Sequence, residues 1–265
     1  MYLEYWGLKE PPFSNVPDRR CFYQSNQHEE ALVRLLYAVE NRKGAAMLTG
    51  EVGSGKTTIS RVLMNSLSKD RFEIITIVNP ALNAVDLIRA ILLEIGERAD
   101  EDSKTILLGR LTNKLSRNAE KNLSTILIID EAHLIKGQSS FEELRMLLNL
   151  QSEQQFLLTL IILGQPPLKE KIAGLKPLKE RISIKYDLSP LSIQDTVRYI
   201  MFRLKTAGAT RGIFSKEAVQ WIYKYAKGIP LRINNACERS LLMGMMMKAR
   251  IIDKKIANFA IEDLK

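Results

Sequence analysis

The sequence is poor in cysteine and histidine and has no long apolar run. Its 265 residues include two cysteines and two histidines. Cys21 and Cys237 stand far apart, so we expect reduced, buried thiols rather than a disulfide or a metal site. No apolar run approaches the roughly 20 residues that span a bilayer. The start, MYLEYWGLKE, lacks the apolar segment of a signal peptide. These absences argue against a secreted or membrane-spanning chain, and we expect a cytoplasmic protein.

Acidic residues are scarce in the C-terminal part of the sequence. Residues 166–265 hold 20 Lys and Arg against 9 Asp and Glu, a net charge of +11. Residues 1–165 hold 19 against 21, a net charge of −2, so the total of +9 comes from the C-terminal part. Clustered positive charge attracts phosphate backbones and anionic membranes. Either a polyanion such as nucleic acid binds there, or the cations form an ordinary solvated surface.

Apolar runs alternate with helical patterns up to Pro190. The runs predict strands at 45–50, 72–78, 124–130, 155–164 and 182–188. Strands separated by helices indicate an α/β fold, with a parallel five-stranded sheet that helices cover on both faces. After Pro190 only helical patterns remain, at about 192–207, 215–226, 230–248 and 253–263. We therefore expect an N-terminal linker and helix packed on the core (1–43), an α/β domain (44–190) and a small helical lid domain (191–265).

The segment GEVGSGKT, at residues 50–57, matches the phosphate-loop (Walker A) pattern G-x-x-x-x-G-K-[ST] between a predicted strand and a predicted helix. Its three glycines let backbone N–H groups turn inward, and the helix N-terminus adds the positive end of its dipole. Lys56 can reach the β- and γ-phosphates, and the Thr57 hydroxyl can ligate Mg²⁺. The predicted nucleotide-binding residues are Gly50, Glu51, Val52, Gly53, Ser54, Gly55, Lys56, Thr57 and Thr58.

The segment ILIIDE, at residues 126–131, supplies the acidic partner of this loop (Walker B). A buried strand that ends in Asp places the carboxylate at the carboxyl edge of a parallel sheet, beside the phosphate loop. Asp130 would hold Mg²⁺ through water, and Glu131 would polarise the attacking water as general base. Alternatively, Asp130 only caps a turn. We expect His133 to be a packing or supporting residue, and His28 to be a surface or helix-start histidine.

The letters DEAH at 130–133 also name a superfamily of helicases. Such helicases need a second core with an arginine-rich box, which this sequence lacks. One sheet followed by a helical domain is typical of AAA+ ATPases instead. That class has a polar residue at the tip of the fourth strand, here Gln165, and an arginine often supplied by a neighbouring subunit, here Arg181. Arg232 could reach back over the nucleotide. For all three, a plain turn or surface role is the alternative.

An ordered set of segments resembles one family. The AAA+ ATPases of general secretion pathway protein A (the ExeA-like group) are similar over roughly residues 2–263, in YWGLKEPPFSNVPD, LTGEVGSGKTT, LIIDEAH, ELRMLLNLQ, LGQPPLKE, RISIKYDLSPLS and GIPLRINNAC. The resemblance implies ATP as ligand and Mg²⁺ as cofactor. It also implies that Gln165 is the first sensor and that Arg181 is the finger that contacts the γ-phosphate. The phosphate-loop and ILIIDE residues would bind and hydrolyse ATP.

Two departures from the family pattern bear on function. The family usually shows G-x-P-R, but Leu231 follows the proline here and Arg232 comes one residue later. The secretion proteins also continue through a membrane span into a periplasmic region, whereas this sequence ends at Lys265, so we expect a stand-alone ATPase. Such a protein is also similar to the ATPases of DNA transposition, such as MuB and TnsC.

Three functions stay open. The motifs favour an AAA+ ATPase that forms a ring or filament, with active sites between subunits, and that remodels or recruits a protein partner in secretion or pilus assembly. The basic C-terminal part favours a transposition regulator that assembles on duplex DNA and recruits a transposase. The third is a nucleotide-dependent scaffold without hydrolysis, against which the Asp130–Glu131 pair argues. The segment WGLKEPPF, at residues 6–13, either lines a base pocket or forms a hydrophobic clasp.

Overall fold

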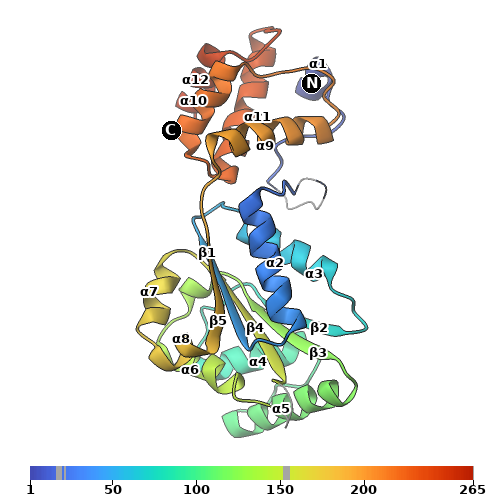
Figure 1. The fold of residues 1–265 in the computed structure, drawn as a ribbon, viewed down its shortest axis with the longest axis vertical. Coiled ribbons are helices and arrows are strands. Elements are labelled where there is room, and N and C mark those ends of the chain that lie inside the picture. The colour runs from blue at the N-terminus through green and yellow to red at the C-terminus, as the bar shows by residue number, and fades with distance from the viewer. Residues whose placement is uncertain (16–19, 21, 152–155, 265) are drawn as a thin grey trace. The chain divides into compact units, whose positions relative to one another are not determined.

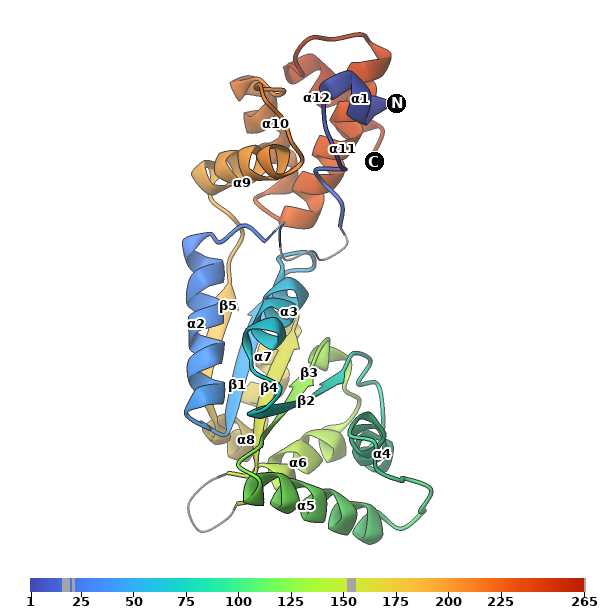
Figure 2. The ribbon, with the colours of Figure 1, turned by 90° about the vertical axis from the view of Figure 1, so that its right-hand side faces the viewer.

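The computed structural model describes residues 1–15, 20, 22–151 and 156–264 (Figures 1 and 2). Its elements in chain order are α1 (Tyr2–Trp6), α2 (Asn26–Glu40), β1 (Ala45–Gly50), α3 (Lys56–Ser66), β2 (Phe72–Ile77), α4 (Ala84–Glu94), α5 (Lys104–Glu120), β3 (Ser124–Ile129), the short 3₁₀ helix η2 (Ala132–Leu134), α6 (Gln138–Leu147), β4 (Leu158–Gly164), α7 (Pro167–Ala173), α8 (Lys176–Arg181), β5 (Ile182–Leu188), α9 (Ile193–Thr206), α10 (Lys216–Ala226), α11 (Pro230–Met246) and α12 (Lys254–Glu262).

The five predicted strands form one parallel sheet in the order β2-β3-β4-β1-β5. Every residue of β1 and β4 is buried, as expected of near-continuous apolar runs covered on both faces. Figure 1 shows α2 and α3 on the face of the sheet opposite to α7 and α8. The largest apolar cluster joins alternate strand residues, among them Met47, Leu127 and Ile162, to helices α4 to α8. The predicted α/β fold is therefore confirmed.

The chain divides into two compact units. The helical unit holds Met1–Glu29, Glu51–Thr58 and Ser189–Lys265, and the sheet unit holds Glu30–Gly50 and Ile59–Leu188. The sequence predicted that residues 1–43 form a linker and a helix that pack on the α/β core. In the structure the start of the chain packs on α11 instead, because Trp6 is buried among the C-terminal helices and its indole Nε1 donates to the Leu241 carbonyl at 2.9 Å. WGLKEPPF is thus part of a hydrophobic clasp within the helical unit.

Side-chain caps begin three helices of the helical unit. Ser192 accepts from the Asp195 N–H at α9, Ser215 from the Ala218 N–H at α10, and Asp253 from the Ile256 N–H at α12. Each cap satisfies one of the N–H groups that a helix leaves unpaired at its start, which contributes about 1 kcal/mol. These caps explain why the three helices begin within a residue of the predicted positions.

Several local predictions met different outcomes. Cys237 is buried and its thiol pKa is raised well above the ordinary value by burial, so it is an inert packing residue; Cys21 lies outside the described residues. Met246, the last residue of α11, and Met247, which follows it, are exposed. Helices α7 and α8 were not predicted, because each has fewer than eight residues and shows too little periodicity.

In the described part of the chain, no helix has the length and apolar character needed to cross a membrane.

Gly228 is required by the turn between α10 and α11. Its φ is +76°, and a Cβ there would lie 2.1 Å from the Leu191 carbonyl oxygen. We expect Gly228→Ala to lower the free energy of unfolding by about 2 to 5 kcal/mol, through left-handed strain and overpacking. Urea unfolding measures this. Gly212→Ala is the matched control, since nothing lies within 4 Å of that Cβ position; equal stability of both variants would contradict the prediction.

Candidate nucleotide-binding site

The carboxyl ends of the central strands meet at one edge of the sheet. The ladder pairs Ile129 of β3 with Ile162 of β4, and Ile162 with Met47 of β1. β3 is followed at once by Asp130, and β4 by Gln165. The phosphate loop leaves the same edge, because it continues from the last residue of β1, Gly50. Parallel pairing thus brings the ends of three strands that carry predicted site residues to one edge of the sheet.

The phosphate loop has a defined internal structure. The Glu51 carbonyl accepts from the Ser54 N–H at 3.1 Å and from Lys56 Nζ at 3.0 Å. Gly53 and Gly55 have φ of +78° and +104°, the left-handed region that glycine adopts without strain. Lys56 is buried, and α3 begins at this residue. The loop therefore has the turn geometry and the helix N-terminus that the motif predicts, and such backbone can receive phosphate oxygens.

The start of α11 contacts this loop. The Leu231 N–H donates to the Gly53 carbonyl at 3.2 Å, and a Cβ on Gly53 would lie 2.3 Å from Leu231 Cβ. Leu231 is therefore the residue of α11 that faces the loop. Arg232 is exposed, and successive helix residues are turned by about 100° from each other. The sensor role of Arg232 stays a prediction, and α11 meets the loop through the Leu231 backbone N–H and the apolar Leu231 side chain.

Glu131 has an unusual backbone conformation. Its φ is 51° and its ψ is 35°, the left-handed region that a non-glycine residue rarely adopts. The preceding Asp130 is buried, and its Oδ1 accepts the Glu131 N–H at 2.8 Å. Strained residues of this kind gather at functional sites, where the surrounding structure holds them in place. Apolar packing would not require this backbone conformation, so the strain supports a functional role for Glu131.

Gln165 and His133 both lie beside the Glu131 carboxylate. Gln165 Nε2 donates to Glu131 Oε2 at 3.4 Å, and His133 Nδ1 lies 3.2 Å from the same oxygen. The Gln165 backbone N–H also donates to His133 Nδ1 at 3.4 Å. The structure thus brings together Glu131 and Gln165, which lie 34 residues apart in the sequence. Nδ1 of His133 can accept from Gln165 or, when it carries a proton, donate to Glu131, but it cannot do both at once. A supporting role for His133 stays a prediction.

Arg181 lies at the amino ends of the strands, opposite to the carboxyl edge of the sheet. It ends α8 just before β5, where Ile182 pairs with Ala45, whereas Leu188 pairs with Gly50 at the carboxyl edge. At a rise of about 3.3 Å per residue, the two ends of β5 are about 20 Å apart. Arg181 is exposed and its Nη1 donates to the Leu148 carbonyl at 3.5 Å. Within one sheet unit, Arg181 is therefore remote from the Glu131–Gln165 pair.

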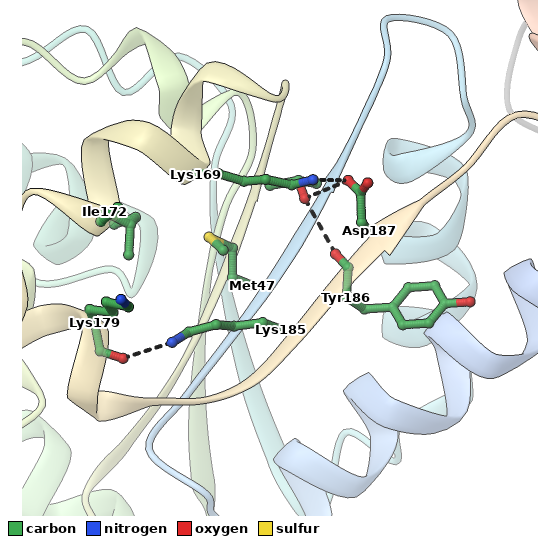
Figure 3. A pocket seen from close by; sticks show the side chains of 9 residues that line it. Met47, Lys169, Ile172, Lys179, Lys185, Tyr186 and Asp187 are labelled. Carbon is green, nitrogen blue, oxygen red and sulfur yellow. Dashed lines mark hydrogen bonds and ion pairs between the residues drawn. The ribbon is translucent and has the colours of Figure 1, made fainter.

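A hollow with a volume of about 260 Å³ opens beside β5 (Figure 3). Met47 and Ile172 form its apolar floor, and three lysines rim it. Lys169 is neutralised by Asp187 at 2.8 Å, while Lys185 Nζ donates to the Lys179 carbonyl at 3.0 Å. None of the predicted nucleotide-binding residues lines this hollow. It is a basic surface feature next to the element that carries Arg181.

The predicted metal ligands fit Mg²⁺ by their chemistry. Mg²⁺ prefers oxygen donors and takes one or two protein carboxylates, with phosphates and waters completing its shell. The Thr57 hydroxyl and the buried Asp130 carboxylate are such donors. No group of three or more His, Cys, Asp or Glu side chains in the described ranges could hold a metal ion. The assignment of Thr57 and Asp130 as the residues that would hold Mg²⁺ stays a prediction.

His28 is the residue that the sequence underestimated. It lies in the first turn of α2, as expected, but it is buried rather than on the surface. Its Nε2 lies 3.0 Å from the Ser54 carbonyl oxygen of the phosphate loop, and its Nδ1 lies 2.7 Å from Ser25 Oγ. Burial lowers the imidazole pKa below its ordinary value, against smaller opposing effects of Ser54 and Asp195. No motif joins residues 28 and 54, so only the structure reveals this contact.

A five-stranded parallel sheet, a phosphate loop after β1, and acidic and polar residues after β3 and β4 define a P-loop nucleotide triphosphatase fold with an appended helical unit. A family model described as "AAA domain" matches residues 39–172, half of the chain. The chain belongs to this AAA family. It is 39% identical over 246 residues to General secretion pathway protein A of Aeromonas hydrophila, across 91% of this chain but 44% of that protein. The chain thus spans less than half of this relative.

Solved structures share the fold at low sequence identity. The ORC2 protein of Aeropyrum pernix, determined as ADPNP-ADP complexes, is 15% identical with a TM-score of 0.70, over 96% of this chain and 72% of that chain. Drosophila ORC bound to DNA is 17% identical with a TM-score of 0.68, over 99% and 65% of the two chains. A mutant of RuvB from Thermotoga maritima is 20% identical with a TM-score of 0.59, over 89% and 69%. These likenesses establish the AAA+ architecture.

Proposed function

We propose that this chain binds ATP through Gly50–Thr58 and hydrolyses it with Glu131 as the general base. The observation that carries the proposal is the Glu131–Gln165 pair, in which an amide holds a carboxylate at 3.4 Å on a strained residue just after β3. A carboxylate so placed can accept a proton from water, and the Gln165 amide can orient that water. The ADPNP-ADP complexes of the ORC2 relative give further support for a nucleotide ligand.

Each loop residue would have a distinct task. Phosphoryl transfer depends mostly on positioning and on electrostatic stabilisation, so the Lys56 ammonium and the inward N–H groups would offset phosphate charge. Mg²⁺, held by Thr57 and through water by Asp130, would supply further positive charge to the phosphates. Phosphate release from ATP, measured with the unmodified protein and with Glu131→Gln, tests this part of the proposal.

We further propose that active sites form between subunits of a ring or filament. Arg181 is exposed and lies about 20 Å along β5 from the carboxyl edge, so it would serve a neighbour's nucleotide rather than its own. The apolar, lysine-rimmed hollow next to α8 (Figure 3) would face that neighbour. An arginine donated in this way offsets the charge that develops on the γ-phosphate.

The partner that responds to the ATP cycle is proposed to be a protein. Support comes from the 39% identity to General secretion pathway protein A, a protein named for secretion. In this role the helical unit would change its position with the state of the nucleotide, and the oligomer would remodel or recruit its partner. The chain spans less than half of that relative, so its partner is inferred from the shared part alone.

Duplex DNA is the second candidate partner. The net charge of +11 over residues 166–265 favours it, and one relative of the same fold was determined bound to DNA. Exposed cations on α12 include Lys254 and Lys255, and Lys254 Nζ lies 4.7 Å from the centre of the Trp221 ring. An aromatic ring beside cations suits a surface that contacts nucleic acid.

Fluorescence anisotropy with duplex DNA separates the two candidates. If DNA is the partner, the protein should bind in ATP at low salt, and affinity should fall about 10-fold or more between 50 and 200 mM salt. Lys254→Glu with Lys255→Glu should abolish most of this binding. Lys69→Glu with Lys121→Glu, the same change of charge on the sheet unit, is the matched control. Absence of binding in ATP at low salt would rule out the DNA candidate and leave the protein partner.

A further inference from the structure

We propose that His28 is a positioning residue for the phosphate loop. Its imidazole holds the Ser54 carbonyl on the outer side of the loop, so that the following Gly55 N–H points towards the phosphates. The proposal rests on the proposed function, because it assumes that this loop receives a nucleotide. All the residues concerned belong to the helical unit, which includes both Met1–Glu29 and Glu51–Thr58.

The hydrogen bonds of His28 fix its tautomer. A carbonyl oxygen can only accept, so the 3.0 Å contact with the Ser54 oxygen requires a proton on Nε2. In the neutral ring Nδ1 then carries a lone pair, which accepts the Ser25 hydroxyl proton at 2.7 Å. Both ring nitrogens are thus satisfied in the uncharged ring. Burial supports this state, since it lowers the imidazole pKa and keeps the ring neutral at pH 7.

The bond to Ser54 orients more than one group. The peptide between Ser54 and Gly55 is planar and trans, so its C=O and N–H point in opposite directions. Holding the carbonyl against His28 therefore turns the Gly55 N–H to the other side of the loop. Gly55 itself has φ of +104°, and a Cβ there would lie 3.0 Å from His28 Nε2. The glycine and the histidine thus fit each other closely at this peptide.

Other contacts hold His28 in place. Ser25, three residues before His28, anchors it: the Ser25 hydroxyl also accepts the His28 backbone N–H at 3.4 Å. The Phe22 ring meets the imidazole edge to face, with ring centres 6.0 Å apart. A buried donor held by such contacts loses little freedom when the loop binds phosphate, which is the condition for a preorganised site.

Two substitutions isolate the bond to the loop. His28→Leu removes both ring nitrogens and puts an apolar side chain in the buried position. His28→Gln keeps an N–H donor near the position of Nε2. We expect the dissociation constant for ADP, measured with a fluorescent analogue in Mg²⁺, to rise about 10-fold in His28→Leu, the effect of one lost hydrogen bond to a buried carbonyl. His28→Gln should stay within about 3-fold of the unmodified protein. The KM for ATP should rise in the same order, with a smaller change in kcat.

A second measurement does not depend on nucleotide binding. The chain has only two histidines, so the imidazole ¹⁵N spectrum at pH 7 is simple, and His133→Gln assigns it. We expect His28 to be neutral with its proton on Nε2. A proton on Nδ1, or a charged ring, would overturn the proposal even if the Leu variant failed to fold.

The outcomes separate this proposal from the proposed function. If the unmodified protein binds ADP and His28→Leu binds it equally well, the positioning role is wrong and the function stands. If His28→Gln binds as weakly as His28→Leu, the donor is not what matters, and the positioning role is again overturned. If the unmodified protein binds neither ADP nor ATP in Mg²⁺, the proposed function itself fails.

Discussion

Replacing Glu131 with glutamine should leave ATP bound and stop its turnover. Glutamine keeps the size of the side chain but cannot accept a proton from the attacking water, so we expect kcat to fall about 10² to 10⁴-fold. The phosphate loop is not altered, so the dissociation constant for ATP should stay within about 3-fold of that of the unmodified protein. Phosphate release and equilibrium binding of an ATP analogue measure the two quantities separately.

The neighbour of Glu131 provides the control for this substitution. His133 Nδ1 lies 3.2 Å from the same Glu131 carboxylate, but the histidine has a supporting role in our proposal. His133→Gln should therefore lower kcat by less than about 10-fold. If Glu131→Gln retains full turnover, the general base has been assigned to the wrong residue. If His133→Gln loses as much turnover as Glu131→Gln, the base is His133 or the pair acts as one unit.

Replacing Arg181 with alanine should lower kcat about 10³-fold or more, the loss expected when an arginine no longer offsets charge on the γ-phosphate. We expect this effect to act between subunits, because Arg181 and the carboxyl edge of the sheet lie at opposite ends of β5. Lys176→Ala, on the same helix α8 and outside the lining of the hollow, is the matched control and should change kcat by less than about 10-fold. ATP turnover, measured over a range of protein concentrations so that the proposed oligomer can form, tests both variants.

A mixture of Arg181→Ala and Glu131→Gln proteins tests action between subunits directly. Some interfaces in mixed oligomers combine an intact Arg181 from one subunit with an intact Glu131 from the next. For equal amounts mixed at random, about a quarter of the interfaces should regain activity. Mixed oligomers that remain inactive would contradict the finger assignment, and full activity of Arg181→Ala alone would contradict any role for this arginine in turnover.

The sheet could be predicted closely from the sequence. Strands at Ala45–Gly50 and Ile182–Leu188 have the predicted bounds; Gly44 and Glu51 flank the first, and Arg181 and Ser189 flank the second. Strand β4 begins at Leu158, later than the predicted 155, and residues 152–155 lie outside the described part. The helices α7 and α8 were not predicted. Segments this short are stabilised by packing on the sheet, and they are too short to show a helical periodicity in the sequence.

The site could be predicted in part. The phosphate loop and Asp130 follow from motifs in which strand, turn and helix are adjacent in sequence, so local patterns suffice to place them. Gln165 was placed at the tip of β4, and the structure adds its bond to Glu131. His28 and Leu231 could not be found this way, because each meets the loop through a contact between segments distant in sequence.

Local sequence patterns were enough to predict the parallel sheet, the phosphate loop after β1 and the acidic pair after β3. These features arise from hydrophobic periodicity and glycine placement, which act over a few residues. The groups that hold the loop become visible only once the chain is folded. The Gly53 carbonyl accepts from Leu231 at the start of α11, and the Ser54 carbonyl accepts from His28 at the start of α2. Buried carbonyls need donors, and no rule of sequence spacing states which distant segment will supply them.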